Sequence, residues 1–375
     1  MKKPRVVVGL SGGVDSSVAL WLLKKQGYQA IGLTLRLPVW AGTGENNICC
    51  TIAGIRWVKR LCLKLEVPHF LLDCRQEFQQ TVVDYFVQEY RQGRTPNPCV
   101  ICNQKFRFPK FFEFAGQYQA EFIATGHYVK NSKLKTQNSK VIYKLLRAKD
   151  KTKDQSYFLA RLGQRELSRT LFPLGDYTKK EVYQMAKKQG FHSPVQRQES
   201  QDFCYVDQKH KNDFLKEALG DRSGPIVDFK GKILGRHQGL HFYTLGQRHG
   251  LGLNGLFYVQ RLDAAQNTLV ITRDRRDLYQ KEVIMDNWNF ISGPPHRRAG
   301  LPPKKAIKVQ AKTRSAQLLQ PATLYPPKGK KLRLVFTQPQ FAITPGQFCV
   351  FYVPSEASAK LGEGETCLGS GVIIP

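Results

Sequence analysis

Acidic residues are scarce in this chain of 375 residues. Only 29 Asp and Glu stand against 58 Lys and Arg, so the formal net charge is +29. Such an excess of positive charge opposes compaction, and a polyanionic partner such as a nucleic acid would offset it. The alternative is a proteome in which every protein is rich in lysine. Charge alone leaves both explanations open.

Long apolar runs are absent, and cysteines are sparse. No stretch of about 18 uncharged apolar residues occurs, which excludes a membrane-spanning helix, and no membrane contact is expected. The nine cysteines, an odd number, are too few for a disulfide scaffold. The opening MKKPRVVVGL leads directly into a strand-like run, so we expect no targeting segment. These features predict a reducing compartment, the cytoplasm, where thiols are available for chemistry.

What the chain does contain is enough apolar sequence, 41% of residues, for two or three domains. Strand-like runs at 5–10, 28–35, 68–73 and 120–125 alternate with helical patterns. This alternation predicts an α/β fold with a doubly wound parallel sheet. The intervening helical patterns lie at 15–26, 51–66 and 76–91.

The pattern changes farther along the chain. Residues 154–190 read as helical, with Thr178 as a helix cap ahead of Glu181. From about residue 220 the chain becomes strand-like and rich in glycine, and from about 281 short apolar runs alternate with Pro and Gly. We therefore predict three domains: a catalytic domain at 1–213, a small β-rich central domain at 214–280 and a C-terminal β-barrel at 281–375.

The sharpest local motif is SGGVDSS, Ser11 to Ser17, between a predicted strand and a predicted helix. Gly12 and Gly13 allow backbone N–H groups to converge on an anion, and the helix adds its positive N-terminal end. Asp15 is placed to hold Mg²⁺ through water. The motif lacks the lysine of a P-loop, and it is not GxGxxG. A plain capped turn is the alternative reading.

Two cysteine segments suggest thiol chemistry. The first, GRTPNPCVICNQKFRF, contains Cys99 and Cys102 in a C-x-x-C, and the second, ESQDFC, ends at Cys204. We expect Cys102 to open a helix near Lys105 and Arg107, which would lower its pKa. Cys99 and Cys102 form only half of a zinc site, because no second C-x-x-C exists. Other cysteines in apolar patterns are expected to be buried and inert: Cys62, Cys74, Cys349 and Cys367.

Together, these segments resemble the tRNA-specific 2-thiouridylase family of PP-loop ATP pyrophosphatases. The resemblance spans nearly the whole chain, with GLSGGVDSSVA, GRTPNPCVICNQKFRF, ATGHYV, KDQSYFLARL, LFPLGDYTKKEV, ESQDFC, YTLGQRHGLG and FAITPGQ in that order. It implies ATP-dependent thiolation of the wobble uridine of tRNA, with Cys102 as the nucleophile and Cys204 as the persulfide carrier. The family uses tRNAs for Lys, Glu and Gln.

The resemblance also implies binding residues. ATP contacts are implied for Gly9, Leu10, Ser11, Gly12, Gly13, Val14, Asp15, Ser16, Leu35 and Gly126. Contacts with tRNA are implied for Asn97, Pro98, Cys99, His127, Lys153, Asp154, Gln155, Arg314, Ser315 and Gln347. Some members carry Asp where this chain has Cys99, which argues against a required carboxylate there. Some carry Met at Leu35, so the apolar contact with adenine is kept.

The residues also make chemical sense by themselves. A uracil 2-oxygen leaves poorly until it is adenylated, and a sulfur nucleophile then reaches C2 only if the base is flipped out of its stack. Residues 130–153 carry eight Lys and one Arg against one Asp, so we predict that 130–160 binds the anticodon stem-loop. A solvated loop is the alternative. His127 directly follows a strand, where parallel sheets place their sites. His237 and His241 are interpreted as structural or surface groups.

Several alternatives remain open. An iron–sulfur cluster held by Cys99, Cys102 and Cys204 ranks behind the persulfide route, since no fourth ligand is evident. A PP-loop amide-forming synthetase would need neither the cysteines nor RNA. A non-enzymatic RNA-binding module is disfavoured by the intact SGGVDS. The sulfur donor, a cysteine desulfurase or a sulfur-relay protein, is not identified by the sequence.

Overall fold

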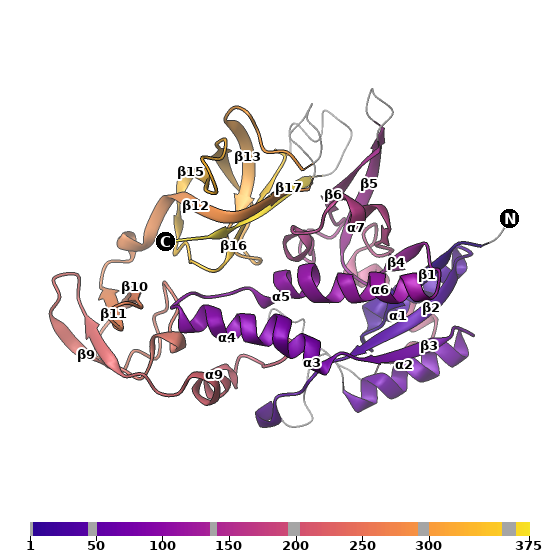
Figure 1. The fold of residues 1–375 in the computed structure, drawn as a ribbon, viewed down its shortest axis with the longest axis horizontal. Helices are drawn as coiled ribbons and strands as arrows, with labels where there is room; N and C mark the ends of the chain where they lie inside the picture. The colour runs from indigo at the N-terminus through magenta and orange to yellow at the C-terminus, as the bar shows by residue number, and fades with distance from the viewer. Residues whose placement is uncertain (1–2, 44–50, 136–140, 194–202, 292–299, 355–364) are drawn as a thin grey trace.

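Three parts make up the molecule in Figure 1: a sheet with its helices, a β-barrel above it, and a small β-rich unit at one end. The computed structural model describes residues 3–43, 51–135, 141–193, 203–291, 300–354 and 365–375. Among these described residues, no helix combines the length and the apolar character needed to cross a membrane.

A parallel sheet forms the centre of the N-terminal part, with strand order β3-β2-β1-β4-β7. The strands are β1 (Arg5–Gly9), β2 (Gln29–Arg36), β3 (His69–Asp73), β4 (Phe122–Ala124) and β7 (Thr170–Leu171). Every neighbouring pair is parallel. The first four strands lie where the apolar runs predicted them, and the doubly wound α/β fold is confirmed.

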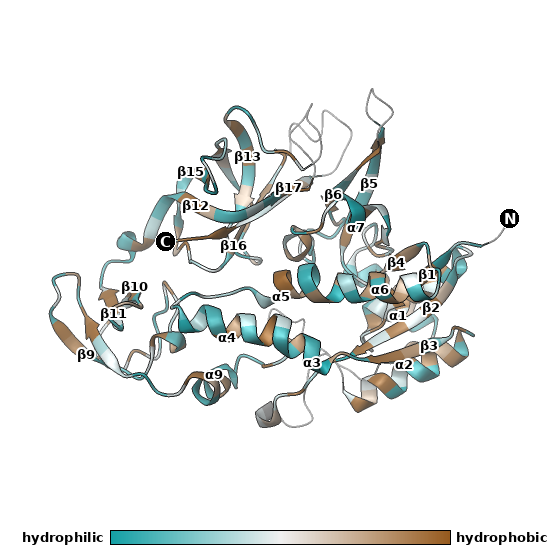
Figure 2. Ribbon diagram, in the orientation of Figure 1, coloured by the Kyte–Doolittle hydropathy of each residue, from teal (hydrophilic) through white to brown (hydrophobic). Residues whose placement is uncertain are grey.

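Both faces of this sheet are covered because β1 is apolar on both sides. Val7 belongs to one core cluster and Val6 and Val8 to another, as expected for side chains that alternate across a strand. The cluster around Val6 and Val8 includes α1 (Val14–Lys25), α2 (Ile52–Lys64) and α8 (Lys179–Lys188). The cluster around Val7 includes α4 (Asp84–Arg91) and α6 (Phe108–Gln117). Figure 2 shows α4 and α6 with separate hydrophilic and hydrophobic faces.

Residues 154–190 are only partly helical, so that prediction was wrong in its middle. They form a 3₁₀ turn (Ser156–Leu159), α7 (Gln164–Ser168), β7 and α8. Strand β7 has only two residues, which is too short for an alternation of apolar and polar residues to be recognised in the sequence. It is defined as a strand by its pairing with β4. The predicted cap is confirmed: Thr178 Oγ1 accepts from Glu181 N at 3.3 Å, and Glu181 Oε2 accepts from Thr178 N at 2.5 Å.

A central unit follows α9 (Lys211–Leu219). Its four-stranded sheet has the order β10-β11-β8-β9. The strands are β8 (Gly224–Val227), β9 (Ile233–His237), β10 (Tyr258–Asp263) and β11 (Thr268–Thr272). Its core is a separate cluster that includes Ile226, Val259, Leu269 and Ile271. The predicted β-rich character of this unit is therefore confirmed.

The C-terminal part is a closed barrel. Its ring runs β12-β15-β14-β13-β16-β17, and β17 pairs back to β12. The strands are β12 (Tyr279–Phe290), β13 (Ile307–Lys312), β14 (Gln320–Leu324), β15 (Leu332–Phe341), β16 (Phe348–Tyr352) and β17 (Thr366–Ile373). Closure removes exposed sheet edges. The predicted β-barrel is confirmed.

The lysine-rich segment begins as a hairpin. β5 (Val129–Lys135) and β6 (Val141–Arg147) pair with each other, and β6 also pairs with β17 through Leu146 and Thr366. The barrel sheet therefore takes two strands from the part of the chain assigned to the first domain. The domain boundaries at 213 and 280 stay predictions.

Candidate active site

The loop between β1 and α1 is shaped for the close approach of an anion. Gly12 has φ +81°, and a Cβ there would lie 3.0 Å from the Cα of Gly54, so only glycine fits. Ser16 Oγ accepts from Ser11 N at 3.3 Å and donates to Gly13 O at 3.0 Å. Because α1 begins at Val14, its positive end lies at the same loop. This geometry supports the predicted phosphate site across Gly9–Ser16.

The two other residues implied for ATP lie at the same edge of the sheet. Leu35 is near the carboxyl end of β2, and Gly126 follows β4. A Cβ at Gly126 would lie 2.9 Å from Ser16 N, so the backbone after β4 lies against the start of α1. The carboxyl ends of parallel strands therefore bring Leu35, Gly126 and the loop together, as is usual for ligand sites in α/β sheets.

Asp15 has partners that the sequence did not predict. Lys179 Nζ donates to both carboxylate oxygens of Asp15 at 2.7 Å, and Tyr128 Oη donates to Oδ1 at 2.8 Å. Burial, together with the Asp15 charge, raises the pKa of Tyr128. Both oxygens of Asp15 are thus engaged by protein groups.

Cys102 does not open a helix, contrary to the prediction. The helix begins four residues earlier at Pro98, where Asn97 Oδ1 caps Val100 N at 3.4 Å. Cys102 instead begins a π-helical turn, Cys102–Arg107, that continues into α6. Cys102 is 5% exposed and lies beyond the first turn of the helix. The unpaired N–H groups that would stabilise a thiolate are in that first turn, so they do not act on Cys102. Short π-helical turns within longer helices often mark functional sites.

The structure brings the segments of Cys102 and Cys204 into one apolar cluster. Phe78 lies between them, with its ring centroid 5.2 Å from that of Phe106 and 6.4 Å from that of Phe203. Phe106 follows Cys102 by one turn, and Phe203 directly precedes Cys204. Cys102 belongs to this cluster, and Cys204 packs against it half-buried. Both thiols are free of disulfides.

The cysteine set does not fit an iron–sulfur cluster. Over the described residues, which include all three candidate cysteines, no group of three or more His, Cys, Asp or Glu side chains is placed to hold a metal ion. Cys99, Cys102 and Cys204 therefore do not form the three-ligand set that the cluster alternative requires.

Four other cysteines behave as apolar core residues, as predicted. Cys62, Cys74, Cys349 and Cys367 are at most 1% exposed. Burial raises the pKa of Cys62 to about 12 and that of Cys74 to about 11, and it raises the pKa values of Cys349 and Cys367 as well. These thiols stay protonated and unreactive at neutral pH. Cys49 and Cys50 lie outside the described residues.

His127 lies next to the nucleotide edge as a neutral imidazole. Its Nδ1 is 2.7 Å from Thr125 Oγ1, and its ring lies 6.3 Å from that of Phe108, nearly parallel to it. Burial, with a smaller effect from Arg107, lowers the pKa of His127 to about 3. Its contact with tRNA stays a prediction. His237 and His241 are 1% and 4% exposed, so they are interior rather than surface groups.

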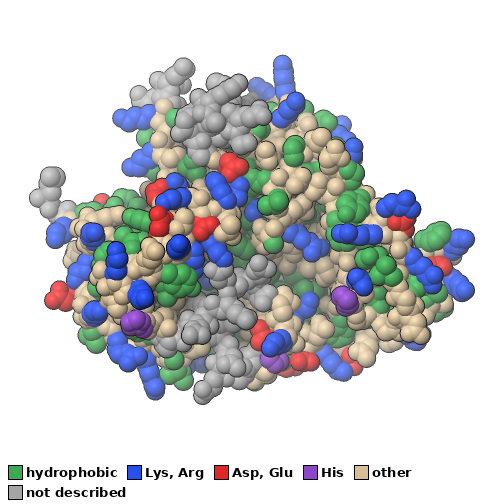
Figure 3. Space-filling model, turned by 180° about the vertical axis from the view of Figure 1, so that it is seen from behind, with side chains coloured by type: hydrophobic (Ala, Val, Ile, Leu, Met, Phe, Trp, Pro, Cys, Tyr) green, Lys and Arg blue, Asp and Glu red, His purple; other side chains and the backbone are tan. Residues whose placement is uncertain are grey.

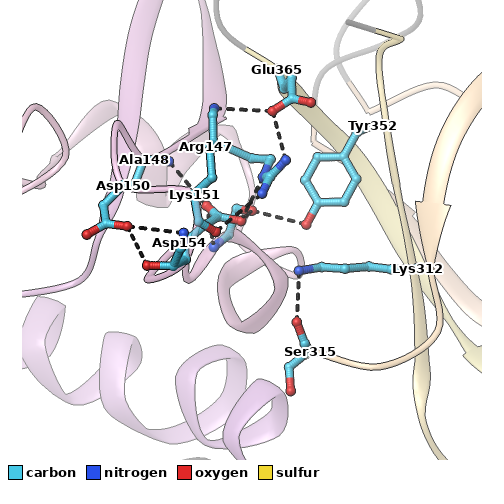
Figure 4. A network of polar contacts seen from close by, with 11 residues as sticks. Arg147, Ala148, Asp150, Lys151, Asp154, Lys312, Ser315, Tyr352 and Glu365 are labelled. Atoms are coloured by element: carbon cyan, nitrogen blue, oxygen red, sulfur yellow. Dashed lines mark hydrogen bonds and ion pairs between the residues drawn. The ribbon is translucent and has the colours of Figure 1, made fainter. Parts of the chain in front are cut away.

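The loop 153–155 is fixed from inside. Asp154 has a side chain only 1% exposed, and its Oδ2 lies 3.0 Å from Arg147 Nε and 2.8 Å from Ser156 Oγ. Figure 4 shows this carboxylate within a polar network that reaches the barrel. Gln155 Oε1 accepts from Tyr128 N at 2.9 Å. The Asp154 side chain thus holds the loop, and the half-buried Lys153 is the charged group nearer to solvent.

The same network includes barrel residues implied for tRNA. Arg147 Nη1 pairs with Glu365 at 2.8 Å, and Lys312 Nζ donates to Ser315 O at 3.0 Å (Figure 4). Burial lowers the pKa of Lys312. Arg314 is exposed, and its Nη2 donates to Thr344 Oγ1 at 2.7 Å. Ser315 therefore lies beside the junction of the barrel with the N-terminal part (Figure 4), whereas the bond of Arg314 to Thr344 stays within the C-terminal part.

Gln347 contacts the loop that precedes Cys102. Its Nε2 donates to Thr95 O at 2.8 Å and to Pro96 O at 3.1 Å. A Cβ at Gly346 would lie 3.0 Å from Arg94 Cβ, so the two backbones pack closely. The structure thus brings Gln347 to the segment of Asn97, Pro98 and Cys99, although about 250 positions separate them in sequence.

Sequence reasoning missed Arg161 as well. Arg161 Nε donates to Gln104 Oε1 at 3.2 Å, and its Nη2 donates to Asn287 Oδ1 at 3.0 Å, with a further bond to Asn287 O. Its side chain is buried, which lowers its pKa to about 10. Arg161 therefore links the π-helical turn of Cys102 to strand β12. Arg161 lies within the KDQSYFLARL segment, but only the three-dimensional contacts identify this role.

Positive side chains are scattered over one face of the molecule (Figure 3). In Figure 3, Lys and Arg side chains are spread over the face seen from behind, with few acidic groups among them. The hairpin strand β5 carries Lys133 and Lys135, and Lys135 is exposed. A polyanion fits such a surface.

Comparison with known families agrees with this architecture. The family models "tRNA methyl transferase HUP domain", "tRNA methyl transferase PRC-barrel domain" and "Aminomethyltransferase beta-barrel domain" match residues 4–208, 212–273 and 280–373. The "tRNA-specific 2-thiouridylase MnmA" of Legionella pneumophila (strain Lens) is 38% identical, over 99% of this chain and 98% of that protein. The protein of the same name from Natranaerobius thermophilus is 39% identical, over 100% of this chain and 98% of that protein.

A more distant likeness is found among solved structures. A 4-thiouridine synthetase–RNA complex with bound ATP has a TM-score of 0.37 and 15% identity, and it covers 58% of this chain and 50% of that chain.

The fold and the site define a PP-loop protein: a nucleotide-binding α/β sheet that carries a cysteine pair and two appended β domains. Identity of more than a third over nearly the whole length then makes the assignment specific. The chain belongs to the tRNA-specific 2-thiouridylase family.

Proposed function

We propose that this chain is an ATP-dependent tRNA sulfurtransferase that replaces the 2-oxygen of the wobble uridine with sulfur. The observation that carries the proposal is the presence of a phosphate loop and of the Cys102 and Cys204 segments in the same α/β part of a chain that matches named tRNA-specific 2-thiouridylases over its full length. All three of its family models carry the name of a methyltransferase or an aminomethyltransferase. The SGGVDSS loop and the cysteine pair fit ATP-driven sulfur transfer better than methylation.

The first step is adenylation. The 2-oxygen of uracil attacks the α-phosphorus of ATP, the bond to pyrophosphate breaks, and the N3 proton is lost to solvent. The glycine loop and the start of α1 hold the phosphates, while Leu35 offers adenine an apolar contact. The base must leave its stack to reach this edge of the sheet. Neutral His127, beside Gly126, provides a ring on which a flipped base can stack.

The second step is sulfur transfer. A persulfide on Cys204 carries the outer sulfur, and the thiolate of Cys102 attacks the inner one. A Cys102–Cys204 disulfide forms and hydrosulfide leaves; hydrosulfide then displaces AMP from C2. The disulfide takes two electrons from an external thiol before the next turnover. The shared aromatic cluster around Phe78 supports the approach of the two cysteines, which needs Cα atoms within about 7 Å.

The basic β5–β6 hairpin and residues at the junction of the barrel with the N-terminal part bind tRNA in this proposal. We assign contacts to Lys153, Arg314, Gln347 and the 97–99 loop, on positions shared with the family. Each phosphate neutralised adds about −0.7 to −0.9 to the slope of log K against log salt. Charge reversal in residues 130–153 should therefore flatten the slope, and an unchanged slope would identify the hairpin as only a solvated element. The sulfur donor, a desulfurase or relay protein, is to be found by persulfide transfer to Cys204.

One assay tests the function against the amide-forming alternative. The protein is incubated with ATP, with tRNA transcripts and with a persulfide donor, and pyrophosphate and 2-thiouridine are measured. We expect pyrophosphate release to require tRNA and thiouridine to require Cys102 and Cys204. Pyrophosphate release that depends on a small carboxylic acid and ammonia, but not on tRNA, would establish the alternative.

A further inference from the structure

The phosphate loop has no lysine of its own, but the fold delivers one. In P-loop proteins a lysine within the loop reaches the β- and γ-phosphates, whereas residues 11–17 here read SGGVDSS. Lys179 Nζ lies 2.7 Å from each carboxylate oxygen of Asp15, in the first turn of α1. The two residues are 164 positions apart. A cation therefore stands at the loop, although the motif contains none.

The sequence around Lys179 fixes the path of its side chain. Lys179 is the first residue of α8, which the Thr178 and Glu181 capping box starts. Its backbone N donates to Asp150 Oδ2 at 3.0 Å. Its ammonium lies 4.9 Å from the ring centroid of Tyr183 and 5.6 Å from that of Tyr128, and the side chain is 15% exposed. Helix, cap and rings together hold the ammonium in one place.

An ammonium has three N–H donors, and Asp15 uses two of them. The two side chains are 15% and 33% exposed, and an ion pair at such a partly buried place adds little net stability. Stability alone is therefore a weak reason for this arrangement. The loop N–H groups and the start of α1 already favour an anion at this point. A third donor there can bond a phosphate oxygen and neutralise charge as pyrophosphate departs.

We propose that Lys179 is a phosphate-binding residue of this site, which contacts ATP from α8 while it remains paired with Asp15. The proposal rests on the proposed function only in its use of ATP. It adds a residue outside the loop to the nucleotide site, and it gives Asp15 the role of holding that cation. The rival role is a lysine that neutralises Asp15 and touches no ligand.

The test compares ATP with adenosine, which lacks the phosphates. Affinities are measured for the wild type, Lys179→Met and Lys179→Arg, and tRNA-dependent pyrophosphate release is followed in parallel. We expect Lys179→Met to weaken ATP at least tenfold, to leave adenosine unchanged and to slow pyrophosphate release about 10²-fold. Lys179→Arg should recover part of both losses. The matched control is Lys180→Met, because Lys180 is the exposed neighbour on the same helix turn.

A double variant separates the two roles and guards against misfolding. Lys179→Met leaves a partly buried carboxylate unpaired, whereas Asp15→Asn with Lys179→Met removes both charges. If Lys179 binds phosphate, the double variant should still bind ATP more weakly than Asp15→Asn alone. A lysine that only neutralises Asp15 predicts equal affinity, which would overturn the proposal, as would equal loss for ATP and adenosine in Lys179→Met. Wild-type protein that binds ATP but releases no pyrophosphate with tRNA would instead reject the proposed reaction.

Discussion

Replacing Arg161 should uncouple sulfur transfer from adenylation. Arg161 links Gln104, in the π-helical turn that begins at Cys102, to Asn287 on β12 of the barrel. None of these hydrogen bonds of Arg161 involves the phosphate loop. Arg161→Met removes three hydrogen bonds from a charged donor but keeps an unbranched side chain of similar length. We therefore expect the Cys102 helix to lose its fixed position relative to the barrel, while the ATP-binding edge of the sheet is preserved.

The size of the effect follows from the partners left behind. A buried polar group without a partner costs about 1–3 kcal/mol. Asn287 is exposed and Gln104 is half-buried, so water replaces part of what is lost. We expect a loss of about 2 kcal/mol in the free energy of unfolding, toward the middle of that range. A displacement of about 1 Å at a reacting group can cost about 10²-fold in rate, so thiolation should fall by 10- to 100-fold.

The assay measures two products in the same tube. Pyrophosphate reports adenylation, and 2-thiouridine, quantified by mass spectrometry of digested tRNA, reports sulfur transfer. Arg165→Met is the matched control, because Arg165 is exposed on α7 four residues along. In a single turnover, with enzyme in excess over tRNA, pyrophosphate should stay within about twofold of wild type in both variants, and thiouridine should form more slowly only in Arg161→Met. Equal loss of both products, or loss of neither, would refute the proposed link between Arg161 and Cys102.

Three further results are expected. Burial lowers the pKa of His127 to about 3, so as pH falls below about 6.5 this side chain takes up a proton in the unfolded chain but not in the folded one. The free energy of unfolding should therefore drop by about 1.4 kcal/mol more between pH 7.5 and 5.5 in wild type than in His127→Asn. An equal drop in the two proteins would contradict this. Gln347→Ala should speed hydrogen exchange at the Thr95 amide without changing exchange in the barrel core, because the bonds of Gln347 to the carbonyls of Thr95 and Pro96 are lost. Unchanged exchange at Thr95 would show that these two bonds do not hold the loop before Cys102. Cys62 and Cys74 should resist alkylation at pH 8 in the native state, and rapid labelling would show them to be accessible.

Local features of the fold were predictable from the sequence. The VVV run of β1 is apolar on successive residues, which is typical of a strand buried on both faces, and both faces are covered. The paired glycines before α1 and the Thr178 cap depend on neighbours within a few residues. Such signals are short-range, because backbone conformation and helix capping are decided within about one turn.

Contacts between distant segments were not predictable in the same way. Nothing in the sequence near Asp15 indicates that Lys179 will pair with it, and nothing near Leu146 indicates pairing with Thr366. These contacts follow from the order of strands and from how three units pack. The misplaced helix start at Cys102 has a local cause: proline is favoured in the first helical turn, so Asn97 and Pro98 already define the start.

The three parts of the molecule meet at the loop that leads to Cys102. Thr95 N donates to Pro345 O at 3.0 Å, its carbonyl accepts from Gln347, and its Oγ1 lies 3.2 Å from Thr244 Oγ1 in the central unit. The backbone there is irregular, so these bonds rather than a helix or sheet ladder define its position. The position of the residues that precede Cys102, the proposed nucleophile, is therefore set by the barrel and the central unit together. The two β-rich parts thus hold the loop that leads into the proposed active site, which the parallel sheet alone does not position.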